Sequence, residues 1–312
     1  MALKLGYLLP TRENIMQDRP DGGLLIDAAK HAHALGFDSV WAGDSLLARP
    51  RHEPLTLLAG VAGAVPDVEI GTAVLLPMLR NPVLLAHQLA TVDQVSEGRL
   101  IVGAGIAQDN PAVRAEFAAA GVPFEKRVGR MMEGFRLCKA LWSGEPVDWD
   151  GLWQVESGVL GPKPYREGGP PIWLGTGVRP GIERAAKHFD GWFPIGPDAE
   201  KFGERKVVFR EAAAAAGRDA DKLTTAIYLT VAISDDPDEA DQRINQYMER
   251  YYNAPAAAMR SFQACHAGTI GQVMAWIRTF VAAGAEHVIL RLVGDRKSML
   301  EQIAAERVEL ES

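Results

Sequence analysis

The chain of 312 residues is 47% hydrophobic and 23% charged, which is the composition of a globular protein with a large core. A net charge of −7 without a long basic run argues against a nucleic-acid-binding protein. No apolar run reaches the roughly 18 residues that a membrane span needs, and the N-terminal residues resemble a strand rather than a signal peptide. We therefore expect a cytoplasmic protein with no membrane partner.

The first part of the chain alternates between predicted strands and predicted helices. Short apolar segments predict strands at residues 4–9, 38–42, 68–75 and 99–104, and the third of these is rich in β-branched residues. Helical periodicity, with Pro near the first turn or Gly after the last, predicts helices at residues 23–35, 54–65, 82–96 and 127–141.

Residues 144–171 break this rhythm. The segment contains Gly, Pro and Trp in alternating patterns, which predicts a hairpin followed by an extended crossing. We expect Trp149 and Trp153 to pack this segment onto the rest of the fold.

The alternation then resumes. Strands are predicted at residues 172–174, 191–194, 223–233 and 287–292. Helices are predicted at residues 181–188, 198–216, 238–252, 272–283 and 299–308, with a further Ala-rich helical insert after Pro255.

Eight strands separated by helices predict one (β/α)8 TIM-barrel domain over residues 1–312, with insertions after the fourth and seventh strands. An open, doubly wound sheet is the alternative that the pattern leaves. In a barrel the functional site lies at the carboxyl ends of the strands, so the residues that follow each strand are the informative ones.

Several residues stand at these strand ends. Asp44 follows the second strand and is a candidate acceptor for a ring N–H of a cofactor, or alternatively a loop carboxylate that caps a helix. The sequence Gly103-Ala104-Gly105 follows the fourth strand but lacks the third glycine of a dinucleotide-binding fingerprint. These glycines fit better as room for a planar ring.

The loop Gly175-Thr176-Gly177 leads into a helix, where unpaired N–H groups and the helix dipole favour an anion. We predict a phosphate here, with added charge from Arg179 or Arg184, against the alternative of a plain turn. His52 is a candidate acid or base. No histidine pair has metal-ligand spacing, so no metal site is predicted. The thiol of Cys265 beside His266 is more simply structural.

Four segments, taken together in their order and spacing, resemble the luciferase-like monooxygenase superfamily of flavin- and F420-dependent enzymes. They are LGFDSVW at 35–41, IGTAV at 70–74 continuing to Arg80-Asn81-Pro82, TVDQVSEGRL at 91–100 continuing to 103–105, and GPPIW at 169–173 continuing to 190–192.

The resemblance implies a barrel in which the isoalloxazine or deazaflavin ring lies over the third strand, beside a non-proline cis peptide between Ala73 and Val74. It also implies that the phosphate lies near the loop after the fifth strand. The candidate catalytic residues are Asp44 and His52. The candidate cofactor-binding residues are Asp44, Ala73, Val74, Gly105, Gln108, Gly175, Thr176 and Gly177.

The chain departs from one branch of the family. F420-dependent sugar-phosphate dehydrogenases carry a His after the strand-two Asp and a Glu after the strand-four glycines, where Ser45 and Gln108 stand here. We therefore expect a monooxygenase that uses reduced FMN and O2 on a small organic substrate. A separate flavin reductase would supply the reduced FMN. An F420-dependent reductase or dehydrogenase and a non-catalytic flavin-binding protein are the alternatives. The family further implies a homodimer, and residues 251–253 are a candidate lid.

Overall fold

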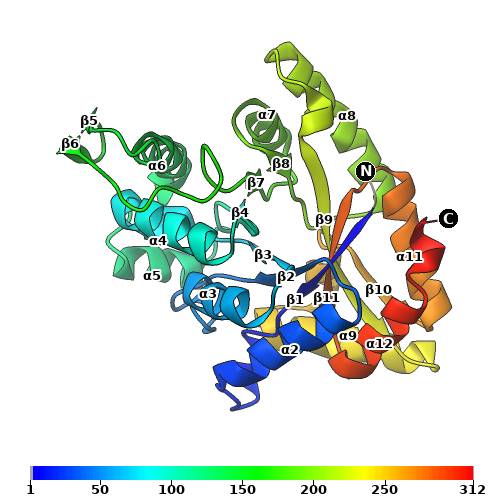
Figure 1. The fold of residues 1–312 in the computed structure, drawn as a ribbon. Coiled ribbons are helices and arrows are strands. Elements are labelled where there is room, and N and C mark those ends of the chain that lie inside the picture. Colours follow the sequence, from blue (N-terminus) through cyan, green and yellow to red (C-terminus); the bar gives the residue numbers. More distant parts are fainter. Residues whose placement is uncertain (1–2, 312) are drawn as a thin grey trace. The chain divides into compact units, whose positions relative to one another are not determined.

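The structure is a computed structural model that describes residues 3–311, and its parallel strands form a (β/α)8 barrel (Figure 1). The strands follow the order β10-β9-β11-β1-β2-β3-β4-β7-β8, and β8 also pairs with β9, which closes a ring of eight. The ring consists of β1 (Lys4–Leu8), β2 (Ser39–Ala42), β3 (Glu69–Thr72), β4 (Leu100–Ala104), β7 (Ile172–Leu174), β8 (Gly191–Trp192), β9 (Thr224–Ile233) and β11 (His287–Leu292). The predicted barrel is therefore confirmed.

The longer helices follow the strands in sequence. They are α2 (Gly22–Ala34), α3 (Pro54–Ala64), α4 (Pro82–Val95), α5 (Pro111–Ala119), α6 (Arg127–Leu141), α7 (Arg179–His188), α8 (Ala199–Ala215), α9 (Pro237–Tyr252), α11 (Ile270–Ala282) and α12 (Arg296–Ala305). The short ones are α1 (Glu13–Met16), α10 (Ala256–Arg260) and α13 (Val308–Glu311), with the 3-10 turns η1 (Pro77–Leu79), η2 (Phe124–Lys126) and η3 (Ala220–Lys222). None of the helices in residues 3–311 is both long and apolar enough to cross a bilayer.

Contacts divide the chain into two compact units. Unit 1 comprises the chain up to Leu9, Asp27–Trp41 and the part from Trp173 onward. Unit 2 comprises Pro10–Ile26 and Ala42–Ile172. Each unit is described by itself below.

The core of unit 1 contains a cluster of aromatic rings around His287. The His287 ring lies 5.5 Å from the Trp41 ring and 5.4 Å from the Trp173 ring, and its Nε2 is 2.7 Å from Ser39 Oγ. Burial, with a smaller effect of the Lys4 charge, lowers the pKa of His287 to about 3. The imidazole is therefore a neutral core residue at neutral pH.

The two ends of the described chain meet in unit 1, where β1 pairs in parallel with β11 (Figure 1). Arg307 donates hydrogen bonds to the carbonyl of Gly36 and, at 2.9 Å, to the carboxylate of Asp38. Asp38 in turn accepts the backbone N–H of Leu5 at 2.7 Å. The last helices are thus tied to the first strand by polar contacts as well as by strand pairing.

In unit 2 the guanidinium of Arg99 connects helix α3 to the strands. It donates to the carbonyls of Ala62, Val65 and Val68 at 2.8–3.0 Å, which satisfies acceptors at and beyond the end of α3. The indole of Trp142 donates to the carbonyl of Ala86 at 3.0 Å and so ties the end of α6 to α4.

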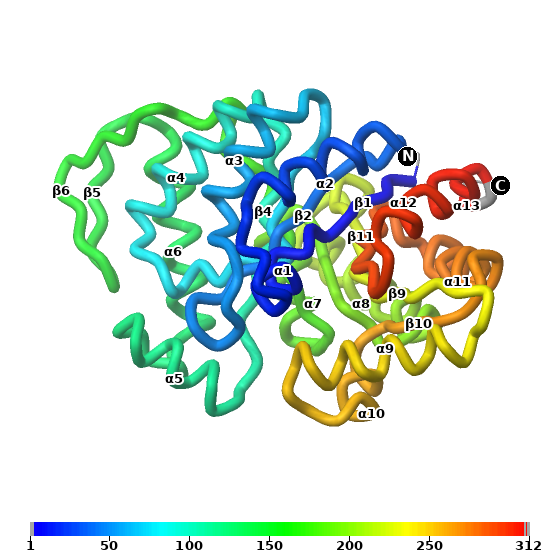
Figure 2. The backbone as a smooth tube through the Cα atoms, turned by 90° about the horizontal axis from the view of Figure 1, so that it is seen from below, coloured from blue at the N-terminus to red at the C-terminus, as the bar shows by residue number. Residues whose placement is uncertain are grey.

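The predicted hairpin is present in unit 2 as the antiparallel pair β5 (Val147–Asp150) and β6 (Gln154–Gly158), which lies beside α6 (Figure 2). Its tryptophans contact that helix rather than the strands. Trp149 Nε1 is 3.4 Å from Glu133 Oε1, and the Trp153 ring lies 4.8 Å beneath the guanidinium of Arg130.

The elements that were not predicted include β10, α1, α5 and α13. The short strand β10 (Cys265–Gly268) pairs only with β9, so it lacks the apolar pattern of a strand that is buried on both sides. The helices α1 and α5 lie in the segments that follow β1 and β4, and α5 begins at Pro111 after Asn110, whose side chain accepts the Val113 N–H. Helix α12 starts at Arg296 rather than at residue 299 because Asp295 caps it by accepting the Ser298 N–H at 3.3 Å.

Candidate active site

The predicted site residues of unit 2 follow strands β2, β3 and β4. The peptide bond between Ala73 and Val74 is cis, as predicted from the family resemblance. The backbone beyond it is held on β4, because Leu75 donates to the carbonyl of Gly103 at 2.7 Å and Gly105 donates to the carbonyl of Leu75 at 2.9 Å.

Gly105 is needed because of its contact with Val74. A Cβ atom added at Gly105 would collide with Cγ2 of Val74. A Cβ atom added at Gly43, at the end of β2, would collide with the guanidinium of Arg51 and lie 3.4 Å from the carbonyl oxygen of Ala73. The two glycines thus keep the ends of β2 and β4 free of side chains around Ala73 and Val74.

Asp44 is buried in this group, with only 1% of its side chain exposed. Its Oδ2 accepts the Leu76 N–H at 2.9 Å and Arg80 Nη1 at 2.6 Å, while its Oδ1 accepts Arg80 Nη2 at 3.1 Å. The carboxylate thus positions the chain just after Val74. Its predicted role as an acceptor for the cofactor stays a prediction.

Arg80 is the partner that sequence reasoning missed, although it lies in one of the segments that carry the resemblance. It also bonds Glu53 at 2.9 Å. Burial alone would raise the pKa of Glu53, but hydrogen bonds from Thr56 and Arg80 lower it below its ordinary value. Burial opposes the charge of Arg80, and Asp44 and Glu53 together raise its pKa. Each of Glu53 and Arg80 therefore favours the charged form of the other.

His52 lies in a loop of the same unit and contacts two backbone carbonyls. Its Nδ1 is 3.3 Å from the oxygen of Thr11 and its Nε2 is 2.9 Å from the oxygen of Pro20. A neutral imidazole can donate to only one of these acceptors. The contacts tie residue 52 to the loop after β1, and the acid or base role stays a prediction.

Gln108 and Ser45 occupy the two positions that depart from the dehydrogenase branch. Gln108 is exposed, in the irregular segment between β4 and α5. The hydroxyl of Ser45 donates to Oε1 of buried Glu116 at 2.7 Å, and the same oxygen accepts the N–H groups of Leu47 and Ala48 at 2.8 and 3.2 Å. Ser45 thus orders the loop after β2. The cofactor contact predicted for Gln108 stays a prediction.

In unit 1 the loop Gly175-Thr176-Gly177 connects β7 to α7. The Thr176 side chain lies against Gly181 in the first turn of α7, where a Cβ atom would collide with it, and the Thr176 carbonyl accepts the indole N–H of Trp192 at 2.8 Å. Within residues 3–311, no side chain caps the helix N-terminus at Val178. Pro180 has no N–H, and the N–H groups of Gly181 and Ile182 donate to the carbonyl of Val178 at 2.9 and 3.0 Å, so the phosphate predicted at this loop stays a prediction.

Arg205 is a cation beside this loop that we did not predict, and the charge expected from Arg179 or Arg184 stays a prediction. A Cβ atom at Gly177 would lie 3.4 Å from Arg205 Nη1, which donates to the carbonyl of Gly196 at 3.0 Å. Arg179 instead pairs with Glu183 at 3.0 Å on the surface. Sequence alone gave no signal for Arg205, because it comes from the next helix, α8.

Residues Tyr251 and Tyr252, predicted as part of a lid, end helix α9, and Asn253 after them has a left-handed φ of 50°. Both tyrosine hydroxyls accept hydrogen bonds from Arg291 of β11, at 3.3 and 2.8 Å. The segment thus packs on the barrel through these contacts, and its opening stays a prediction.

The thiol of Cys265 is not activated. Burial raises its pKa to about 11, and the neighbouring His266 ring stacks on Trp276 at 5.2 Å. A protonated, buried thiol is a poor nucleophile. This agrees with the structural interpretation of the Cys-His pair.

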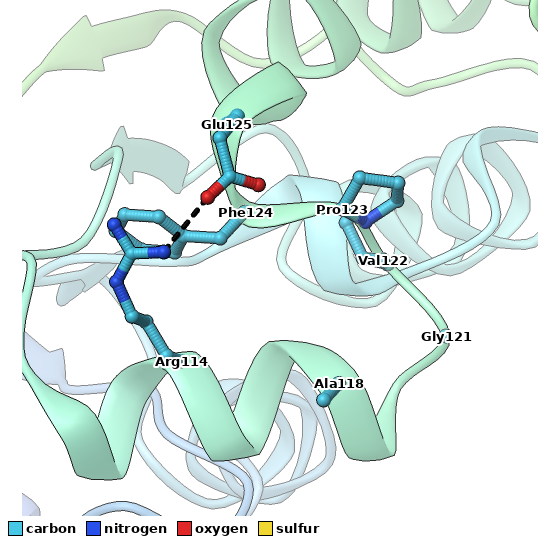
Figure 3. A pocket seen from close by; sticks show the side chains of 7 residues that line it. All are labelled: Arg114, Ala118, Gly121, Val122, Pro123, Phe124 and Glu125. Carbon is cyan, nitrogen blue, oxygen red and sulfur yellow. Dashed lines mark hydrogen bonds and ion pairs between the residues drawn. The ribbon is translucent and has the colours of Figure 1, made fainter.

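A surface hollow in unit 2 lies between α5 and η2, and its lining includes the charged side chains of Arg114 and Glu125 (Figure 3). Arg114, which points across it, pairs with Glu125 at 2.7 Å and with Asp109 at 2.6 Å, and its guanidinium covers the Phe124 ring at 4.6 Å. The charge of Arg114 is thus already paired with carboxylates, and we assign no function to this hollow.

Comparison with known proteins gives consistent matches. The family described as luciferase-like monooxygenase matches residues 3–310. The F420-dependent glucose-6-phosphate dehydrogenase of Mycolicibacterium smegmatis is 29% identical over 249 residues, which cover 76% of this chain and 71% of that protein. The corresponding Nocardia farcinica protein is 29% identical over 69% of this chain and 66% of its own length.

Solved structures share the fold. The monooxygenase RslO1 from Streptomyces bottropensis has a TM-score of 0.84 at 23% identity, covering 99% of this chain and 100% of that one. An F420-dependent secondary alcohol dehydrogenase has a TM-score of 0.83 at 20% identity, with 98% of each chain covered.

Proposed function

The chain belongs to the luciferase-like monooxygenase family, and on that premise we propose that it is an F420-dependent oxidoreductase that transfers hydride to or from a small organic substrate. The observation that carries the proposal is the 29% identity with F420-dependent glucose-6-phosphate dehydrogenases over three quarters of the chain. This replaces reduced FMN, our expectation from the sequence, with the F420 alternative.

The residues present fit a flat cofactor with a phosphate. In unit 2 we propose that the ring lies against Ala73 and Val74, where the lack of a Cβ at Gly43 and Gly105 lets the side chains of Arg51 and Val74 approach the ends of β2 and β4. In unit 1 we propose that the phosphate lies at residues 175–177, beside Arg205 and the N-terminus of α7. When bound, F420 would supply the hydride chemistry, and the protein would hold the cofactor and exclude water.

The hydrogen-bonded network of Asp44, Arg80 and Glu53 would act as a positioning group in this proposal. It fixes the backbone of Leu76, two residues beyond Val74, and so holds the surface on which we place the ring. A rigid, preformed surface lowers the entropic cost of binding.

We propose that the substrate is not a sugar phosphate handled as in the matched dehydrogenases. Ser45 and Gln108 stand where the family resemblance implies a His and a Glu, and Ser45 is bonded to Glu116. These departures are also the observation that favours the second candidate function, an FMN-dependent monooxygenase. A separate reductase would supply its reduced FMN.

The test is a parallel equilibrium titration of the purified protein with F420 and FMN, each in oxidised and reduced form. We expect F420 to bind at least about tenfold more tightly, a difference of about 1.4 kcal/mol. Tighter binding of reduced FMN, together with O2 consumption, would establish the second candidate instead. Gly105→Val should weaken binding of the preferred cofactor, whereas Gly129→Ala, at an exposed glycine with open space around it, should not.

A further inference from the structure

Four tyrosine rings surround the buried guanidinium of Arg291 in unit 1. Its Cζ lies 4.4 Å from the ring centre of Tyr251, 5.0 Å from Tyr228, 5.7 Å from Tyr247 and 5.9 Å from Tyr252. The arginine is 6% exposed. The rings come from β9 and α9, so two elements of the fold converge on one positive charge.

The charge of Arg291 has no carboxylate partner within residues 3–311. Its two bonds go to hydroxyls, from Nη1 to Tyr252 at 2.8 Å and from Nη2 to Tyr251 at 3.3 Å, and its buried Nε has no acceptor. An arginine has five N–H donors and stays protonated in proteins. Buried charges are ordinarily paired, so a guanidinium with unused donors needs an explanation.

The position of Arg291 agrees with a role in binding. Alternate residues of a strand share one face, so Arg291 faces the same side of β11 as His287, which packs against Trp41 and Trp173 in the core of unit 1. Arg291 lies one residue before Leu292, the last residue of β11. The carboxyl ends of barrel strands are where ligands of this fold bind.

The nearby cation is already neutralised. Arg260 of α10 pairs with Asp241 at 2.6 Å and bonds Asn245 at 2.8 Å. The cluster thus carries one unpaired positive charge, which matches a singly charged anion better than a phosphate dianion. A guanidinium binds a carboxylate through two parallel hydrogen bonds, and the aromatic walls favour an apolar or aromatic remainder.

We propose that the substrate is an organic acid with an apolar or aromatic body. Its carboxylate would bind to Arg291, among the rings of Tyr228, Tyr247, Tyr251 and Tyr252. The inference rests on the proposed oxidoreductase function, because it names the substrate class of that enzyme. The hydroxyl of Tyr252, which also lies 3.1 Å from Gln263 Oε1, would hold the guanidinium in place. Arg291 would be a substrate-binding residue, not an acid or base.

The experiment measures binding to the full chain without cofactor by isothermal titration. The probes are benzoate, its neutral counterpart benzyl alcohol, hexanoate and inorganic phosphate. We expect benzoate or hexanoate to bind in the millimolar range and to weaken at least about tenfold in Arg291→Met, because truncating one partner of a buried charge pair is costly. Arg291→Lys, which keeps the charge but loses the planar fork, should weaken binding less.

The matched control is Arg210→Met, which removes one positive charge from an exposed arginine of α8 paired with Asp221. It should leave benzoate binding unchanged. Circular dichroism verifies that each variant folds. If Arg291→Met does not fold, the carboxylate affinities of Arg291→Lys and Tyr252→Phe test the proposal in its place. Tyr252→Phe keeps the ring and removes the hydroxyl, and it should change carboxylate affinity while leaving benzyl alcohol unaffected.

Three results would overturn the proposal. They are absence of carboxylate binding to the wild-type protein, carboxylate binding that is unchanged in Arg291→Lys and Arg291→Met, and tighter Arg291-dependent binding of phosphate than of carboxylates. An F420 titration of the same variants separates the two hypotheses. Loss of F420 binding in Arg291→Met with carboxylate binding intact would assign the guanidinium to the cofactor. A wild-type protein that binds carboxylates through Arg291 but not F420 would contradict the proposed cofactor alone.

Discussion

The carboxylate of Asp44 shows how one buried residue can determine the conformation of a loop. Its two oxygens accept hydrogen bonds from the Leu76 N–H and from both Nη atoms of Arg80. These bonds restrict the segment after β3 to few conformations. The strand-end position of Asp44 could be predicted, because the strand pattern and the Gly before it are local. Its partner could not, since a helix-side arginine meets this carboxylate only once the barrel has formed.

We predict that Asp44→Asn lowers the free energy of unfolding by about 3 kcal/mol, because it leaves the buried charge of Arg80 without its main partner. The measurement is urea denaturation of both proteins at neutral pH. Asp109→Asn is the control, because Asp109 forms its ion pair with Arg114 at the surface, 55% exposed, and its midpoint should not move. Equal midpoints for Asp44→Asn and wild type would show that the network contributes no stability.

The buried ring of His287 makes stability depend on pH. Its pKa is lowered to about 3 in the folded protein, against 6.5 for an exposed imidazole, so only the unfolded chain takes up this proton as the pH falls below 6.5. The free energy of unfolding should therefore decrease on acidification between pH 6.5 and pH 3, and this group should account for about 2 kcal/mol between pH 7 and pH 5.

The measurement compares wild type with His287→Gln in urea at pH 7 and pH 5. Carboxylates and His266, whose pKa burial also lowers, titrate in both proteins, so only the difference between the two pH slopes belongs to His287. Parallel slopes would mean that the ring becomes protonated inside the fold.

At the scale of elements, the strands were predicted well because they are short buried apolar runs, and the helices α3 and α4 because each begins at a Pro. The observed α6 and β7 have the predicted bounds. The failures include β10 and α5. β10 borders only β9, and α5 depends on the Asn110 side chain, which accepts the Val113 N–H at 3.0 Å. Edge strands and capped loop helices are decided by tertiary contacts and local hydrogen bonds.

Gly105 in the loop after β4 packs on Val74 in the loop after β3. We therefore predict that a second substitution at Val74 restores the stability and the cofactor binding that a substitution at Gly105 lowers. Gly105→Ala should weaken F420 binding and lower stability by about 1–3 kcal/mol, because the new methyl group collides with Val74. Adding Val74→Ala should restore much of the loss, and a double-mutant cycle measures the coupling between the two sites. Additive effects would show that the collision is relieved elsewhere.

At the scale of the whole molecule, the proposed function predicts a ligand-dependent stability. F420 at a hundredfold excess over its dissociation constant should stabilise the protein by about 2.7 kcal/mol. Differential scanning calorimetry with F420, FMN and no cofactor checks this, and a larger shift with FMN would contradict the proposal. The homodimer stays a prediction, which sedimentation velocity can test.

The pairing of β1 with β11 bears on how the chain is made. Lys4 lies opposite His287, and Arg307 bonds Asp38 across 269 positions of sequence. On the ribosome, the first strand therefore leaves the exit tunnel long before the strand that covers its open edge has been translated. Such an edge is a template for wrong pairing. We expect nascent chains stalled before residue 287 to need a chaperone, and chains released after translation to reach the native ring.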